Sequence, residues 1–200
     1  MLKPSGYDEA QAGNFVKAEL GGHYATIKQV AERQSSTGKD MIVVLFDFAE
    51  ADNQSGYFSD LFKNDTRDER KWPFAGSKYI LVKDYNDASK TSRNFKSFCT
   101  CVEKSNNYTI NWNAGDAWGK QFAGKEIGVV YGDEEQEYDG RISMRRVPKW
   151  FCEWNAVKDA KIPDPKYLNG SGPAVRTAPA ATQSDNFMQI PDGVDDEIPF

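Results

Sequence analysis

The chain has 200 residues, of which 28% are charged and 13% aromatic, and its formal net charge at pH 7 is −5. This length fits one medium-sized domain with a tail and allows a substantial hydrophobic core. No run is long and apolar enough for a transmembrane helix, and the first residues lack the charged-then-apolar pattern of a secretory signal. The three cysteines have no paired spacing, which argues against a disulfide framework and favours a reducing compartment. A cytoplasmic protein without a membrane partner is therefore expected.

The predicted elements form a mainly β domain over residues 21–157, after an N-terminal extension over residues 1–20. Strands are indicated by runs that are rich in β-branched and aromatic residues and are bounded by turn formers. Asp139 and Gly140 lie between the last two runs, as in a tight hairpin turn. The predicted strands cover residues 23–31, 41–49, 57–62, 125–132 and 141–147, and residues 79–83 are expected to form a short strand or a helix.

A helix is predicted between the third and fourth strands, because Phe95, Phe98, Cys99 and Val102 recur at helical spacing after a Ser92 N-cap. Three strands, a helix and two strands is the element order of the OB-fold, a five-stranded, partly open barrel that binds oligonucleotides. The folded part is longer than a minimal barrel, so insertions are expected at residues 64–88 and 106–124. The expected fold is therefore mainly β with one or two helices: an OB-fold-like five-stranded barrel with insertions, followed by a disordered C-terminal tail.

The end of the chain has the composition of a linker followed by an acidic tip. Residues 158–194 are assigned to a flexible linker rich in Pro, Gly, Ala, Ser and Thr. Most acidic chain ends are only solvated. Here a terminal Phe beside its own α-carboxylate can enter an apolar pocket on a partner while a basic residue binds the carboxylate. The predicted partner-docking tip consists of Asp195, Asp196, Glu197, Ile198, Pro199 and Phe200.

Two stretches combine aromatic rings with cations, as binding of single-stranded DNA requires. The first candidate surface consists of Tyr57, Phe62, Lys63, Arg67, Lys71 and Trp72. Each of its rings could instead fill the core, although the charged surroundings of Trp72 favour its exposure. The second candidate surface consists of Arg141, Arg145, Arg146, Lys149 and Trp150. These residues could instead form a solvated basic edge that deters strand pairing.

Other chemistry finds little support in the sequence. His23 is the only histidine, and the cysteines do not have a zinc-site spacing. The acidic residues at 133–135, and those at 47, 50 and 52, have the ligand type of a Mg²⁺-dependent nuclease, but they fit turns or solvated ends better. No glycine-rich phosphate-binding loop is present. We expect no enzyme, no cofactor and no metal site.

Taken together, the tip, the element order and the two surfaces resemble a phage- or mobile-element-encoded single-stranded-DNA-binding protein (SSB). Three segments resemble a diverged family in phages of Gram-positive bacteria: TGK before MIVVLFDFAE, YFSDLF with KNDTRDERKWP, and GKEIGVVYGDEE. The likeness is loose over residues 20–155 and tight over residues 195–200. It implies sequence-nonspecific protection of single-stranded DNA during replication and recombination in a bacterial host cell. It also implies that the tip recruits replication, recombination and repair proteins, and it leaves self-association into a homo-oligomer open.

Two alternatives come from other functional classes. An OB-like adaptor would bind proteins only, with the tail as one of its contacts. A single-strand annealing or recombination factor would pair complementary strands as well as bind them. A nuclease ranks last and would degrade DNA in the presence of Mg²⁺.

Overall fold

The computed structural model describes residues 17–168, which form one five-stranded antiparallel sheet in the order β3-β2-β1-β4-β5. This confirms the expected mainly β, OB-like fold with insertions. The predicted tip and most of the predicted linker and N-terminal extension lie outside the described residues. The strands are β1 (Gly21–Gln34), β2 (Asp40–Phe48), β3 (Ser77–Leu81), β4 (Glu126–Tyr138) and β5 (Arg141–Cys152). The helices are α1 (Tyr57–Lys63), α2 (Arg93–Asn106) and the short 3₁₀ helices η1 (Phe74–Gly76), η2 (Gly115–Phe122) and η3 (Trp154–Ala156).

The sheet curls until its two edge strands approach each other. The Lys78 ammonium of β3 donates a hydrogen bond to the Pro148 carbonyl of β5 over 2.9 Å. The Tyr131 hydroxyl of β4 donates to the Ala75 carbonyl of η1, which leads into β3. With α2 between the third and fourth strands, this is the arrangement of a partly open OB barrel.

The core follows the alternation that the sequence predicts. Ile42, Val44 and Phe46 of β2 point inward and are buried, and the predicted helix is confirmed as α2, with Phe98 and Val102 in the same core cluster. The tight turn after β4 is also confirmed, because its two central residues have φ values of 50° and 69°, which a type I′ hairpin turn requires.

The third predicted strand is wrong. Residues 57–63 form helix α1, and the strand that follows β2 in the sheet is β3. The buried carboxylate of Asp47 accepts hydrogen bonds from the backbone N–H groups of Phe58 (2.9 Å) and Ser59 (3.2 Å) at the start of this helix. Those two N–H groups have no partner within a helix, so Asp47 stabilises the helix at its first turn.

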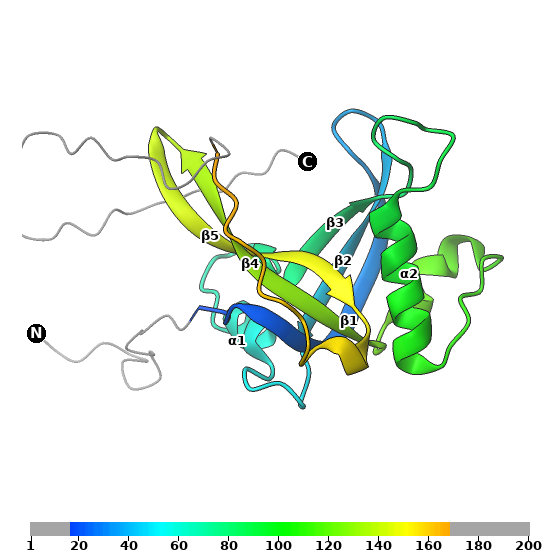
Figure 1. Cartoon of the computed structure of the whole chain (residues 1–200), viewed down its shortest axis with the longest axis horizontal. Helices are drawn as coiled ribbons and strands as arrows, with labels where there is room; N and C mark the ends of the chain where they lie inside the picture. The colour runs from blue at the N-terminus through cyan, green and yellow to red at the C-terminus, as the bar shows by residue number, and fades with distance from the viewer. Residues whose placement is uncertain (1–16, 169–200) are drawn as a thin grey trace, which may run out of the picture.

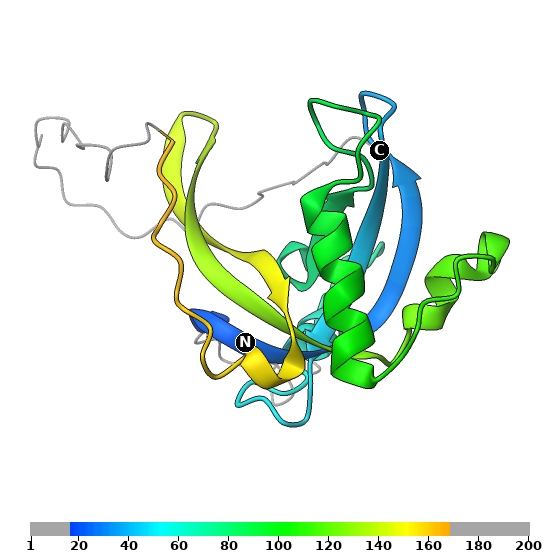
Figure 2. The same cartoon turned by 45° about the vertical axis from the view of Figure 1, so that its right-hand side comes forward.

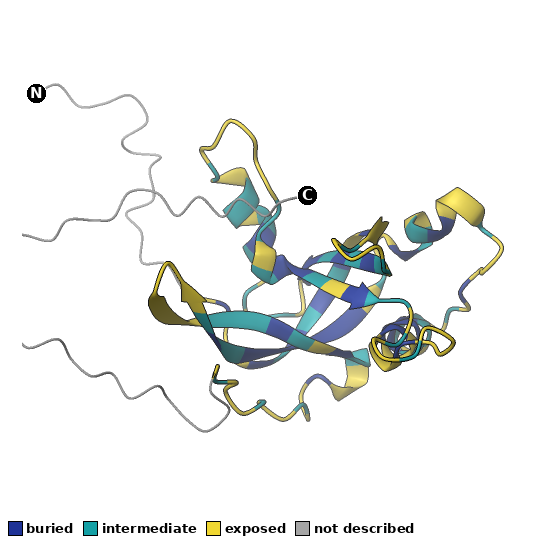
Figure 3. Ribbon diagram, turned by 90° about the horizontal axis from the view of Figure 1, so that it is seen from above, coloured by how far each residue is buried: buried dark blue, intermediate teal, exposed yellow. Residues whose placement is uncertain are grey.

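Two long arms rise from the barrel on opposite sides (Figures 1 and 2). β1 pairs with β4 only as far as Tyr131, so the rest of β4 forms a hairpin with β5 that is exposed towards its turn (Figure 3). The other arm is the end of the hairpin that β1 and β2 form, which closes with the turn over residues 35–39. Residues 158–168, which the sequence analysis assigned to the linker, pack along β4, where Lys166 exchanges backbone hydrogen bonds with Asp133 (3.0 Å) and Glu135 (2.7 Å).

The free energy of unfolding is expected to depend on pH through Lys78, which joins the two edge strands. Burial lowers the pKa of the Lys78 ammonium to about 8; the nearby Lys149 adds to this shift and Glu134 opposes it. A lysine in the unfolded chain titrates near 10.5, so between about pH 8 and pH 10.5 the unfolded chain binds more protons than the folded protein. The contribution of Lys78 to the free energy of unfolding therefore rises with pH across this window.

Replacing Lys78 with Met removes this titration. The stability of Lys78→Met relative to the wild type is expected to be greatest below pH 8 and to fall by up to about 3 kcal/mol by pH 10.5. Denaturant unfolding of both proteins at several pH values measures this difference. A difference that does not change between pH 7 and pH 10.5 would contradict the predicted shift.

Candidate nucleic-acid interface

The outward face of β2 and β3 is the part of an OB barrel on which oligonucleotides bind, together with the loops between strands 1 and 2 and strands 4 and 5. Because Val44 and Ile80 point into the core, their strand neighbours point outward. The outward positions between Met41 and Leu45 of β2, and those paired with them, are Gln29, Ala31, Arg33, Met41, Val43, Leu45, Ser77, Tyr79 and Leu81, of which Ser77 is buried. Arg33 is the only charged residue among them, and the next outward position of β2 is Asp47, which α1 covers.

Two aromatic rings and a guanidinium group stack at the end of this surface near β5. Tyr79 is 46% exposed, and its ring lies 6.3 Å from that of Phe74 at an interplanar angle of 25°. The Arg145 guanidinium lies 3.9 Å from the centre of the Phe74 ring. Because Arg145 also donates a hydrogen bond to the neutral side chain of Gln136 (3.1 Å), its position is fixed while its charge is not neutralised by that contact.

The polypeptide around η1 fixes Phe74 in this stack. The Trp72 indole N–H donates to the Gly76 carbonyl over 2.9 Å, and the Ser77 hydroxyl donates to the Pro73 carbonyl over 3.1 Å. A Cβ at Gly76 would lie 2.8 Å from the Phe58 ring, so only glycine allows this close approach. The stack is therefore held in place before any ligand arrives.

A second cation and ring pair lies at the opposite end of β3. The Lys39 ammonium, in the turn between β1 and β2, lies 3.5 Å from the centre of the Tyr85 ring and donates to the Tyr85 carbonyl over 3.0 Å. Tyr85 is 71% exposed. We call the outward positions of β1, β2 and β3 listed above, with Phe74 and Arg145 at one end and Lys39 and Tyr85 at the other, the β2–β3 face.

The first predicted surface does not form one exposed platform, because its rings lie on or against α1. The Tyr57 ring is half-buried against Phe48, and burial raises the pKa of its hydroxyl. Phe62 and Trp72 contact each other at 5.7 Å. The expectation that Trp72 is exposed is wrong, since its ring is half-buried and its N–H is bonded to Gly76.

The cations of that first surface are exposed, but two of them contact acids of the same segment. Lys63 lies 3.4 Å from Asp60, and Arg67 lies 2.8 Å from Asp65. Lys71 is also exposed. These ion pairs would have to open before Lys63 or Arg67 could bind a phosphate.

The second predicted surface lies along β5 and is divided between two roles. Arg145 belongs to the ring stack of the β2–β3 face. Arg146 instead pairs with Asp133 (2.9 Å), and Lys149 pairs with Glu134 (2.9 Å). Successive side chains of a strand point to opposite faces of the sheet. The cations that were predicted to form one basic patch are therefore divided between two faces of β5.

Arg141 and Trp150 stand at opposite ends of β5. Arg141 is exposed beside the hairpin turn, and Trp150 is exposed on the same edge strand near the barrel. Of this set, the structure brings Arg145 to the stack.

Two of the acidic groups considered as Mg²⁺ ligands, Asp52 and Glu135, accept hydrogen bonds from backbone N–H groups. Asp52 accepts hydrogen bonds from the Tyr24 and Gln54 backbone N–H groups (2.9 and 3.0 Å) and contacts the ring of His23 (3.1 Å). Burial raises the pKa of Asp52, but these hydrogen bonds outweigh it and the pKa is lowered overall. Glu135 accepts from the backbone N–H of Leu168 over 3.1 Å.

The thiols are also in structural environments. Burial raises the pKa of Cys99 to about 12 and that of Cys152 to about 11, so both stay protonated at neutral pH. Cys101 is buried and lies 3.8 Å from the Phe151 carbonyl. Within residues 17–168, no group of three or more His, Cys, Asp or Glu side chains is placed to hold a metal ion.

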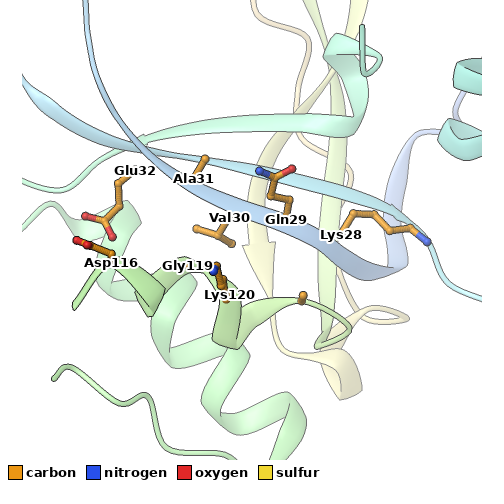
Figure 4. Close-up of a pocket in the computed structure, with 9 residues that line it drawn as sticks. Lys28, Gln29, Val30, Ala31, Glu32, Asp116, Gly119 and Lys120 are labelled. Carbon is orange, nitrogen blue, oxygen red and sulfur yellow. The ribbon is translucent and has the colours of Figure 1, made fainter. Parts of the chain in front are cut away.

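A hollow of about 620 Å³ lies between β1 and η2 and adjoins the β2–β3 face, with which it shares Gln29 and Ala31 (Figure 4). Its charged lining residues are two cations, Lys28 and Lys120, and two acids, Glu32 and Asp116. The charges balance and the lining has no aromatic ring, so this hollow lacks both features that single-stranded DNA requires.

The sequence reasoning missed the rings that the structure brings together. The sequence places Phe74 and Tyr85 in the insertion expected over residues 64–88 and Tyr79 in an uncertain element, and neither these rings nor Lys39 belong to a predicted surface. A signal was present, because residues 79–82 read Tyr-Ile-Leu-Val, a run rich in aromatic and β-branched residues that is typical of a strand.

No protein-family model matches this chain, and no curated protein matches its sequence. In the described part of the chain, no helix is long and apolar enough to cross a membrane.

Proposed function

We propose that this protein binds single-stranded DNA without sequence preference on the β2–β3 face. One observation carries the proposal: the exposed stack of Tyr79, Phe74 and Arg145 on the β2–β3 side of an OB-like barrel. Exposed rings stack on bases, and a neighbouring guanidinium contributes both charge and a flat surface.

The chemistry of the face favours single strands over duplex DNA. In a duplex the bases are already stacked on one another, so their flat faces are not available to Tyr79 and Phe74. The outward positions of this face carry no acid, while Lys39 and Arg145 at its two ends offer positive charge to phosphates. A single strand can satisfy both features at once.

Binding of this kind protects single strands exposed in replication, recombination and repair. The acidic tip, residues 195–200, lies outside the described residues, and its proposed role in recruiting partner proteins rests on the sequence alone. A protein-only adaptor remains the alternative to be distinguished by experiment.

The test is a fluorescence anisotropy titration of labelled oligo(dT) at several salt concentrations, with a duplex of the same length as control. We expect saturable binding that prefers the single strand and weakens with salt, with a log–log slope of about −0.7 for each phosphate contacted. Absence of binding at low salt would overturn the proposal in favour of the adaptor. Equal affinity for the duplex would overturn the role of the rings.

A further inference from the structure

The segment between α2 and β4 presents an exposed tryptophan. Residues 107–124 lie beside α2, on the side away from the β4–β5 hairpin (Figures 1 and 2). Trp112 is 59% exposed, and its ring lies 5.8 Å from that of Trp118 and 6.3 Å from that of Phe95 on α2. A large exposed ring supported from below by two buried rings has the form of a stacking platform.

A single half-buried amide, that of Gln121, builds the loop that carries Trp112. The Gln121 side-chain oxygen accepts hydrogen bonds from the Tyr108 hydroxyl and the Asn111 backbone N–H, both over 2.8 Å. Its nitrogen donates to the carbonyls of Asn111 (3.2 Å) and Trp118 (2.8 Å). These four bonds hold the loop on both sides of Trp112, so the exposure of this ring follows from a defined conformation.

The 3₁₀ helix η2 anchors the same loop to the barrel. Gly119 lies so close to β1 that a Cβ there would be 2.2 Å from the Val30 carbonyl oxygen. The platform is therefore fixed relative to β1, the strand next to β2 in the sheet.

Cations outnumber acids in the two elements that carry the platform. The first turn of α2 contains no acid, and its exposed Arg93 and Lys96 flank Phe95, whereas η2 contributes one acid, Asp116, and one cation, Lys120. The indole N–H of Trp118, which is 8% exposed, has no hydrogen-bond partner among the described residues. Native structures leave few buried donors unsatisfied, and this one lies in the ring cluster that supports Trp112.

The chain also connects the platform to the β2–β3 face. Tyr85, at one end of that face, lies in the loop that joins β3 to α2. The Ser92 backbone N–H donates to the Val82 carbonyl over 2.9 Å, which closes this loop and places the start of α2 beside the end of β3. The first turn of α2 therefore begins at the base of the loop that carries Tyr85.

We propose that Trp112 is a second base-stacking site, on which a strand bound across the β2–β3 face continues past Tyr85 and the cations of α2. This inference rests on the proposed function, because it assigns a further contact to the same ligand. If Trp112→Ala binds both oligonucleotides of the test below as tightly as the wild type does, Trp112 is left as a contact for a protein partner.

The experiment compares a short and a long oligo(dT), of about 6 and about 16 nucleotides, which lie within the range of site sizes for single OB-folds. Trp112→Ala is expected to lower the affinity for the long oligonucleotide by about fivefold or more, the loss of one stacked base, and to leave the affinity for the short one unchanged. Trp112→Phe, which keeps a flat ring, is expected to restore most of the long-strand affinity.

Matched controls separate the possible failures. Ile162→Ala removes an apolar side chain of similar exposure, 60%, from another part of the molecule and is expected to affect neither length. Wild-type affinity of Trp112→Ala for both lengths, or an equal loss for both, would overturn the second site while leaving the proposed function intact. Absence of binding by the wild type would instead overturn the proposed function.

Discussion

Replacing Phe74 and Tyr79 together with Ala is expected to lower the affinity for oligo(dT) by about 2 to 6 kcal/mol. Loss of one base–aromatic stack costs about 1–3 kcal/mol, and the double variant removes both rings of the stack. Because Tyr79 and Phe74 are exposed, their removal should leave the fold intact. Anisotropy titrations of the wild type and of the double variant measure the change.

The conservative variant Tyr79→Phe provides the control for this result. It keeps a flat ring against Phe74 and is expected to bind nearly as tightly as the wild type. The salt dependence of the double variant should stay close to that of the wild type, because Lys39 and Arg145 are still present. Unchanged affinity of the double variant would show that the strand binds elsewhere on the molecule.

Phe46→Ala is expected to lower the free energy of unfolding by about 3–5 kcal/mol. The side chain is fully buried, and its ring contacts Phe58 of α1 at 6.0 Å and Phe151 of β5 at 5.7 Å. One ring thus joins the middle of the sheet to α1 and to an edge strand, and its loss leaves a cavity among all three. This is a large part of the 5–15 kcal/mol that stabilises a typical domain.

Denaturant unfolding measures this loss as a lower midpoint with an unchanged slope. Tyr85→Ala is the matched control, because it removes a ring that is 71% exposed and should cost no more than about 1 kcal/mol. A loss below about 1 kcal/mol for Phe46→Ala would contradict the position of this ring in the core.

The sequence predicted most of the fold because its strands have one buried face. Alternation at Ile42, Val44 and Phe46 indicates a strand, and the turn at Asp139 and Gly140 indicates a hairpin, and both are local signals. The error at residues 57–62 came from weighting aromatic content over spacing. Tyr57, Phe58, Leu61 and Phe62 recur at helical rather than strand intervals, and Asp47, distant in sequence, stabilises the helix.

The candidate site was less predictable, because its residues come from separate parts of the chain. Phe74, Tyr79 and Arg145 meet only when β3 and β5 approach across the barrel. Arg145 and Arg146 are neighbours in the sequence and form part of one basic run. In the folded protein, Arg145 stacks on Phe74, whereas Arg146 pairs with Asp133. Which cations keep an ion-pair partner depends on cross-strand register, and no local pattern reports it.

The most direct test of the central claim is photo-crosslinking of an oligonucleotide containing 5-iodouracil to the full-length protein, with the adducts located by mass spectrometry. We predict adducts at Phe74, Tyr79 and Tyr85 that unlabelled single-stranded DNA competes away and duplex DNA does not. Adducts confined to the α1 side, at Tyr57, Phe62 or Trp72, would contradict the assignment of the β2–β3 face.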